Sequence, residues 1–391
     1  MGVVKTGLEV FLEAPSAFVK NKRLGLLCNP ASVDRRLVHS RLCIENVLAG
    51  RLQALYSPQH GFFAEKQDNM IESGDRIDPA TGLPVFSLYG DTRIPTKAML
   101  DPIDILLVDL QDVGTRVYTF MYTLSYCMES AKRYGKKIVV LDRPNPIGGL
   151  QVEGNLLAAD YSSFVGRFPI PMRHGLTMGE LAILFNTVCG IGCDLDVVAM
   201  RGWRRNMYFT QTGLPWVPPS PNLPTPTSAM VYPGQVIWEG TNVSEGRGTT
   251  QPFELFGAPY MSHNSVLESV DKRWLDGTVL RAVEFEPTSN KWSQHACRGF
   301  QIHVTNPLLY SPYALSLAMY QAIFHCYPEQ FAYISPPYEY EDEKLPMDLI
   351  LGDRQIRFKI ESSVPISDIA STWANELNAF KTRTNSIHLY E

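Results

Sequence analysis

Residues 103–141 read IDILLVDLQDVGTRVYTFMYTLSYCMESAKRYGKKIVVL, and this stretch decides the fold. The apolar run Ile103–Leu110 predicts a buried strand, Tyr118–Tyr134 a helix, and Lys137–Leu141 a second buried strand. Continuous apolar strands joined by a helix are typical of a parallel sheet that is covered on both faces. We therefore predict an α/β core.

The same alternation extends in both directions along the chain. Further strands are predicted at Arg23–Cys28, Arg51–Tyr56, Leu83–Leu88 and Asp194–Met200, and helices at Arg35–Leu48 and Thr177–Val188. Thr177 and Glu180 form a capping-box pattern at the start of the second helix. The resulting prediction is a Rossmann-like, doubly wound, mostly parallel sheet.

The pattern changes after Gly257, where helical stretches mix with short strands. Helices are predicted at Ser265–Leu275, Tyr313–Tyr327 and Ile366–Phe380, and strands at Phe300–Val304 and Arg354–Phe358. This mixture predicts a smaller α+β domain. We place the boundary so that residues 1–257 form the first domain and residues 258–391 the second.

Composition narrows the class of protein. The 391 residues carry a net charge of −5 without a lysine- or arginine-rich run, which disfavours nucleic acid or an anionic membrane as partner. Apolar runs stay below the ~18 residues of a membrane span. The seven scattered cysteines form no CxxC motif and indicate free thiols in a reducing compartment. With no visible signal peptide, we expect a cytoplasmic protein, or a secreted or periplasmic one if a leader was removed.

Polar clusters follow three predicted strands, at the edge where ligands bind in this architecture. They comprise His60; then Asp109, Gln111, Asp112 and Arg116; then Asp142, Arg143 and Asn145. The aspartates leave open a metal site, although no HxH or HExxH pattern supports one. Because GxGxxG, P-loop and GxSxG motifs are missing, we predict no nucleotide cofactor and no serine nucleophile.

Two loops carry candidate catalytic groups. The long loop from His60 contains Glu65, Asp68, Asn69 and Glu72. A glutamate held between Phe62 and Phe63 would have a raised pKa, so Glu65 is the predicted general acid. His174 precedes the helix capped at Thr177, where a neutral imidazole or an anionic ligand is favoured.

The second loop, residues 239–257, reads EGTNVSEGRGTTQPFELFG and follows Val236–Trp238, which predicts a buried strand. It combines Glu239, Asn242, Glu245 and Arg247 with four glycines. Glycine allows the backbone to approach a ligand closely, and the mixture of charges suggests a polar ligand.

Several segments together resemble one family. They are SPQHGFFAEKQDNMIES (57–73), DILLVDLQDVGTRVYTFMYTL (104–124), VVLDRPNPIGG (139–149), PMRHGLTMGE (171–180), PSPNLPT (219–225) and EGTNVSEGRGTTQPFELFGAPY (239–260). In this order they resemble the exo-β-N-acetylmuramidases of the NamZ type, from about Leu24 to the end. The resemblance implies a cleft between a Rossmann-like and a smaller domain. It also implies release of terminal, non-reducing β-1,4-linked N-acetylmuramic acid from peptidoglycan fragments. Many relatives read Glu where this chain has Gln59.

The resemblance suggests roles for the candidate residues. Glycoside cleavage needs an acid and a second group opposite the oxocarbenium-like centre. Glu65 is the predicted acid, with Glu239 or Glu245, or the substrate's acetamido group, as the second group. Arg247 or Arg116 is predicted to pair with the lactyl carboxylate.

The other predicted contacts to a muramyl saccharide or muropeptide come from His60, Glu72, Asp109, Gln111, Tyr118, Asp142, Arg143, Asn145, His174 and Asn242. Two alternatives stay open. One is a sugar-binding module without catalysis, which Gln59 favours. The other is a metal-dependent hydrolase that uses Asp109, Asp112 and Asp142.

Overall fold

A computed structural model describes residues 2–15, 17–67 and 70–391, and its largest sheet confirms the α/β prediction. The strand order is β3-β4-β2-β1-β5-β6-β9, and every neighbouring pair is parallel except β3 with β4. The strands are β1 (Leu24–Cys28), β2 (Leu52–Ser57), β3 (Arg76–Ile77), β4 (Pro84–Ser87), β5 (Ile105–Asp109), β6 (Lys137–Leu141) and β9 (Asp194–Val198). All six strands predicted in this part of the chain are present.

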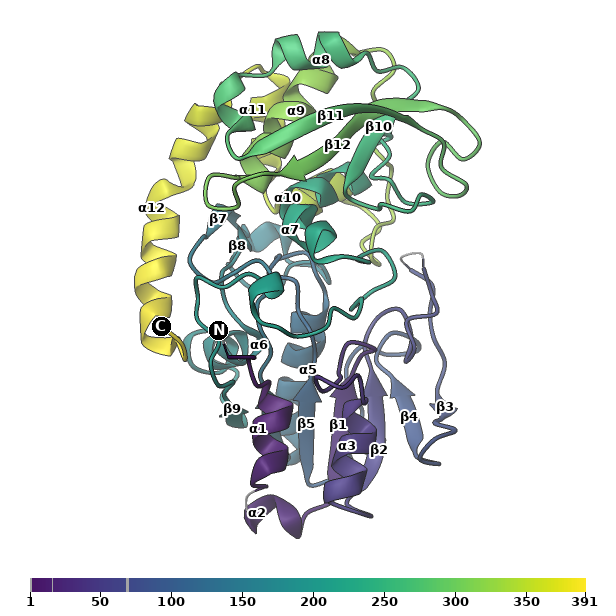
Figure 1. Cartoon of the computed structure of the whole chain (residues 1–391), viewed down its shortest axis with the longest axis vertical. Helices are drawn as coiled ribbons and strands as arrows, with labels where there is room; N and C mark the ends of the chain where they lie inside the picture. The colour runs from purple at the N-terminus through teal and green to yellow at the C-terminus, as the bar shows by residue number, and fades with distance from the viewer. Residues whose placement is uncertain (1, 16, 68–69) are drawn as a thin grey trace.

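Helices cover both faces of this sheet (Figure 1). Side chains alternate along each strand, so Leu106 and Val108 pack with α5 (Phe120–Tyr134) and α6 (Met178–Ile183), whereas Ile105 and Leu107 pack with α1 (Gly7–Glu13) and α3 (Ser40–Val47). Because successive side chains of a strand point to opposite faces of the sheet, one apolar run contributes to two hydrophobic cores. The smaller elements nearby are α2 (Ala17–Lys20), α4 (Lys97–Leu100), η1 (Ala159–Tyr161), η2 (Leu184–Val188), η3 (Phe209–Gln211) and the hairpin β7 (Glu153–Leu156) with β8 (Pro171–Arg173).

The later part of the chain contains a three-stranded antiparallel sheet with helices. The sheet order is β10 (Leu255–Ala258), β12 (Cys297–Val304), β11 (Thr278–Phe285). The helices are α8 (His263–Ser269), η5 (Lys272–Leu275), α9 (Pro312–Cys326), α10 (Pro346–Leu351), α11 (Arg354–Glu361), α12 (Ile366–Thr384) and η6 (Asn385–Ile387). Gly257, the predicted boundary, lies inside β10. The division of the chain there stays a prediction.

Two predicted strands are wrong. Val236–Trp238 belongs to η4 (Val236–Gly240), which continues directly from α7 (Pro226–Gln235). A three-residue apolar run does not distinguish a strand from a buried helix. Arg354–Phe358 is part of α11, where Asp353 accepts a hydrogen bond from the Gln355 backbone N–H as an N-cap. The N-cap at Asp353 favours a helix over the strand that was predicted for these residues.

The chain returns to the first sheet at its end. Figure 1 shows α12 running along one side of the molecule, with the C-terminus beside the parallel sheet. There the Tyr390 hydroxyl donates to Asp142 and the Leu389 N–H to Glu180. Among the described residues no helix is long and apolar enough to cross a membrane.

Candidate functional site

One pocket brings together segments that are distant in the sequence. Gln59 and His60 come from the end of β2, and Val117, Tyr118 and Thr119 from the approach to α5. The other lining residues are Val165, Ser220, Asn222, Leu223, Tyr232, Glu239, Arg247, Phe253, Tyr338 and Glu339. The pocket therefore joins the carboxyl edge of the parallel sheet to the later part of the chain.

Four charged side chains form a connected row at this pocket. Arg247 lies 2.6 Å from Glu239 and 3.2 Å from Glu245. Lys291 lies 2.7 Å from the other oxygen of Glu245, and the Tyr338 hydroxyl donates to Glu239 at 2.6 Å. Burial raises the pKa of Glu245, but the charges of Lys291 and Arg247 outweigh it and the pKa is lowered. Two anions and two cations thus balance.

Glu339 is a second buried carboxyl at the pocket, and the sequence analysis missed it. Tyr89 donates to it at 2.7 Å and Gln59 at 2.9 Å, while the Thr119 hydroxyl donates to the Gln59 amide oxygen. Burial raises the pKa of Glu339, and the charge of Glu239 acts in the same direction. Its sequence, PPYEYEDE (336–343), resembles a solvated acidic loop, so no local signal marks it.

His60 lines the pocket as a neutral imidazole. Burial lowers its pKa to about 4, and the charge of Arg247 adds to the effect. Its Nδ1 lies 2.8 Å from the Lys66 carbonyl, which only accepts, so Nδ1 carries the proton and Nε2 keeps its lone pair.

Three lining residues have strained backbones. His60, Phe253 and Glu339 all have positive φ, at 77°, 63° and 47°. Non-glycine residues in this region cluster at functional sites because the surrounding structure must hold them there. Their convergence on one pocket supports a functional role for it.

The structure does not bring Glu65 to this pocket. Its side chain is 41% exposed, accepts from the Phe63 backbone N–H at 3.1 Å and lies 3.5 Å from Arg76. The aromatic walls predicted around it therefore do not enclose its carboxylate. Glu72 is exposed as well and meets the Tyr340 hydroxyl at 3.4 Å. Asp68 and Asn69 lie outside the described residues.

Most strand-end residues have partners within the protein, and their substrate contacts stay predictions. Arg116 is fully buried and donates to the carbonyls of Asn155, Ile170, Ile350 and Leu351. Asp109 is paired with Arg143 at 2.5 Å. Asp142 accepts from Thr177, Tyr390 and two backbone N–H groups. Apart from the Nε atom of Arg116, the buried polar atoms of these side chains thus have partners among the described residues of the protein itself.

Three of the remaining predicted site residues also have partners within the protein. His174 is buried beside Asp112 at 3.4 Å, and Asn145 bonds to the backbone of Leu176 and Ile147. Asn242 bonds to Gln330, Ala332 and Tyr260. Tyr118 differs, because it lines the pocket and its buried hydroxyl has no hydrogen-bond partner within 3.5 Å among the described residues.

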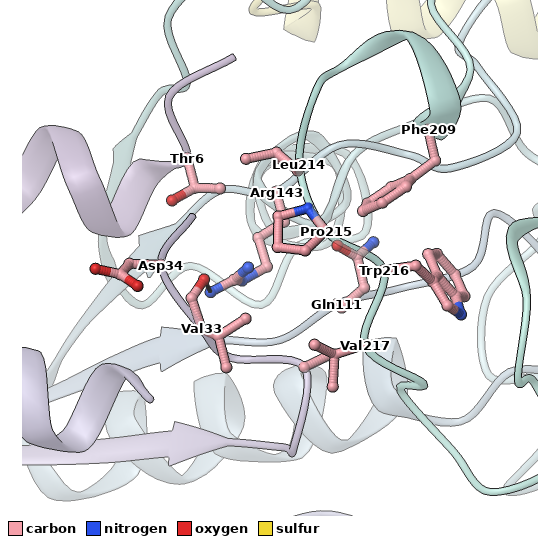
Figure 2. A pocket seen from close by; sticks show the side chains of 11 residues that line it. Thr6, Val33, Asp34, Gln111, Arg143, Phe209, Leu214, Pro215, Trp216 and Val217 are labelled. Carbon is pink, nitrogen blue, oxygen red and sulfur yellow. Dashed lines mark hydrogen bonds between the residues drawn. The ribbon is translucent and has the colours of Figure 1, made fainter. Parts of the chain in front are cut away.

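A second pocket lies at the carboxyl edge of the sheet, where Rossmann-like folds usually bind ligands. Figure 2 shows Gln111 and Arg143 between Val33 and the proline-dense segment that contains Pro215 and Trp216. The cavity volume is about 10 Å³, which is room for about one water molecule. The proline-dense segment therefore fills the position that a cofactor would occupy in such folds.

Comparison with known proteins assigns the family. The family models described as "Exo-beta-N-acetylmuramidase NamZ, N-terminal" and "Exo-beta-N-acetylmuramidase NamZ, C-terminal" match residues 24–227 and 230–390. This chain belongs to the NamZ family. The resemblance found in the sequence is thereby confirmed.

Relatives of this chain match nearly its whole length. It is 43% identical to the peptidoglycan β-N-acetylmuramidase NamZ of Bacillus subtilis (strain 168), over 97% of this chain and 90% of the relative. Crystal structures of two DUF1343 family proteins from Bacteroides fragilis NCTC 9343 have the same fold. One has a TM-score of 0.88 at 34% identity, covering 99% of each chain; the other has a TM-score of 0.77 at 29% identity, covering 100% of this chain and 99% of its own.

The family models divide this chain between residues 227 and 230, within α7. The pocket receives residues from both models, since Gln59 belongs to the first, and Glu239 and Glu339 to the second. Among the residues that the structure describes, no group of three or more His, Cys, Asp or Glu side chains is arranged to hold a metal ion.

Proposed function

We propose that this chain is a glycosidase that releases terminal, non-reducing β-1,4-linked N-acetylmuramic acid from peptidoglycan fragments. Membership of the NamZ family supports the activity, and the named B. subtilis relative supports the substrate class. The observation that carries the proposal is the pair of buried carboxyl groups, Glu239 and Glu339, at one pocket. Most glycosidases use two carboxyl groups in different environments, one as the general acid and one as the nucleophile or base.

Glu339 is the proposed proton donor. The neighbouring row of Glu239, Glu245, Arg247 and Lys291 is already balanced in charge, so ionising Glu339 would add one more buried negative charge. This cost, which comes mainly from burial, raises the pKa of Glu339, so the carboxyl keeps its proton to a higher pH than an ordinary glutamate does. A protonated carboxyl can then transfer its proton to the leaving oxygen.

Glu239 is the proposed second group. Arg247 and Tyr338 fix its two oxygens, so its charge stays at one place while positive charge develops on the sugar. In this position it can stabilise the oxocarbenium-like centre or orient the substrate's acetamido group. Arg247 accordingly positions Glu239 and is not available for the lactyl carboxylate.

Neutral His60 and Tyr118 complete the polar lining. His60 offers an acceptor through Nε2, and Tyr118 offers a buried hydroxyl without a hydrogen-bond partner within 3.5 Å among the described residues. The cavity volume is about 30 Å³, which is enough for roughly two water molecules. A sugar ring needs more room, so we expect the walls to move apart when substrate binds.

The test uses a disaccharide with N-acetylmuramic acid at its non-reducing end. We expect wild type to release free N-acetylmuramic acid, and Glu239→Gln and Glu339→Gln to lose most of this activity. Glu65→Gln, on a half-exposed carboxylate, is the matched control and should retain it. If wild type binds the disaccharide without cleaving it, the glycosidase proposal fails. The compartment stays a prediction, testable by cell fractionation.

A further inference from the structure

Arg93 has an unusual environment beside the pocket. Its Nε atom is buried without a hydrogen-bond partner, and no described residue forms a hydrogen bond or an ion pair with its guanidinium. Aromatic rings hold it instead. The guanidinium carbon lies 3.3 Å from the ring centre of Tyr340, 5.1 Å from that of Phe164 and 5.4 Å from that of Tyr89. The guanidinium is thus fixed in place, while its two NH₂ groups form no hydrogen bond with the described residues.

The three rings connect Arg93 to the proposed catalytic carboxyl. Tyr340 directly follows Glu339, and Phe164 directly precedes the lining residue Val165. Tyr89 donates from its hydroxyl to Glu339. The charge of Arg93 also lowers the pKa of Glu339 against the larger, opposite effect of burial, which places the two groups within electrostatic reach. Arg93 therefore lies at the edge of the same site.

The two arginines predicted to bind a carboxylate are already occupied. Arg116 is buried among backbone carbonyls, and Arg247 is neutralised by Glu239 and Glu245. Neither can form a bidentate pair with a substrate without losing buried partners, which is costly. Among the described residues Arg93 has no such partner to lose, so it is better suited to an anion.

N-acetylmuramic acid differs from N-acetylglucosamine by a lactyl ether that ends in a carboxylate. We propose that Arg93, held by Tyr340, Phe164 and Tyr89, binds this lactyl carboxylate and so makes the site specific for muramyl saccharides. The inference rests on the proposed function, because it assigns a contact within that substrate. A planar guanidinium forms two parallel hydrogen bonds with a carboxylate, which lysine cannot do.

The test compares 4-nitrophenyl β-N-acetylmuramide with its lactyl methylamide, which has the same sugar without the negative charge. For Arg93→Gln, kcat/KM on the acid should fall on the order of 10- to 100-fold, whereas kcat/KM on the methylamide should change less than about twofold. Arg93→Lys should fall between wild type and Arg93→Gln on the acid. Lys97→Gln, which removes an exposed cation four residues after Arg93, is the matched control and should leave both values unchanged.

The two proposals fail in different ways. If Arg93→Gln lowers both substrates equally, or leaves the acid unchanged, the carboxylate contact is refuted while the glycosidase activity stands. If wild type hydrolyses neither substrate, the proposed function fails. Calorimetric binding of free N-acetylmuramic acid to wild type and Arg93→Gln then decides the contact, and equal affinities refute it. Tyr340→Leu, which frees one face of the guanidinium, should weaken binding of the acid but not of N-acetylglucosamine.

Discussion

Replacing Glu339 by glutamine tests the proposed mechanism most directly. The substitution keeps the volume of the side chain and removes the transferable proton. Tyr89 can still donate to the new amide oxygen, and the Gln59 amide can turn so that its oxygen accepts from the new NH₂ group. After this turn the Gln59 NH₂ group faces the Thr119 hydroxyl, which can accept. We therefore expect a stability change of no more than about 1 kcal/mol.

The effect on catalysis should depend on the leaving group. A general acid contributes about 10²- to 10⁴-fold, so Glu339→Gln should lower kcat on a disaccharide by on the order of 10³-fold, or about 4 kcal/mol. The second substrate is 2,4-dinitrophenyl β-N-acetylmuramide. Its dinitrophenolate leaves without a proton, so Glu339→Gln should lower kcat on this substrate about tenfold or less. The assay is steady-state release of N-acetylmuramic acid from both substrates. An equal loss on the two, or near wild-type turnover of the disaccharide, would refute the assignment.

The same residue should control the alkaline side of the pH profile. Activity requires protonated Glu339, so kcat/KM should fall as pH rises through its raised pKa. The groups that act on it, besides burial, are Tyr89, Gln59, Glu239 and Arg93. Tyr89→Phe removes a hydrogen bond that lowers this pKa and should move the alkaline limb to higher pH. A limb that stays in place in Tyr89→Phe would contradict the assignment to Glu339.

Three further predictions concern Glu65, Lys291 and Asp142, which do not line the pocket. Glu65→Gln should change kcat/KM on the disaccharide less than about twofold, because the Glu65 side chain is 41% exposed and does not line the pocket; a hundredfold loss would restore Glu65 as the predicted acid. Lys291→Met leaves Glu245 with Arg247 as its cationic partner and should lower the free energy of unfolding, measured in urea, by about 3 kcal/mol. An unchanged free energy of unfolding would contradict a stabilising role for the Lys291–Glu245 pair. Burial raises the folded-state pKa of Asp142 to about 6, so its contribution to stability is present below about pH 4 and is lost as pH rises through 6, by about 3 kcal/mol. Relative to wild type, Asp142→Asn should therefore gain stability between pH 4 and 7, and a pH-independent difference would show that Asp142 does not titrate there.

The strands of the parallel sheet were predictable because each is a continuous apolar run followed by a turn. Ile105–Asp109 and Lys137–Leu141 needed no information from elsewhere in the chain, since both of their faces are buried. Val236–Trp238 is equally apolar, but its direct continuation from α7 makes it helical. Short apolar segments acquire their conformation from the element that precedes them and from packing, as the stacking of Trp238 on Phe256 shows.

The polar residues were harder to interpret, because residue type does not reveal which groups the protein itself satisfies. Arg116, Asp109 and Asp142 have the chemistry of a ligand site, and the fold uses them to hold loops and the C-terminal segment. Arg247 was correctly located at the pocket, but two carboxylates occupy its guanidinium. Hydrogen-bond partners that are distant in sequence are visible only when the chain is folded.

The sequence by itself determined the parallel sheet and the family, and it singled out the segment that contains Glu239 and Arg247. These properties depend on local periodicity and on contiguous motifs. Only the tertiary structure revealed the second buried carboxyl at the pocket. The Glu339 side chain is buried because Gln59 and Tyr89, some 250 to 280 residues earlier in the chain, pack against it and donate hydrogen bonds to it. Burial and the balance of neighbouring charges set its pKa, and neither quantity exists in the extended chain.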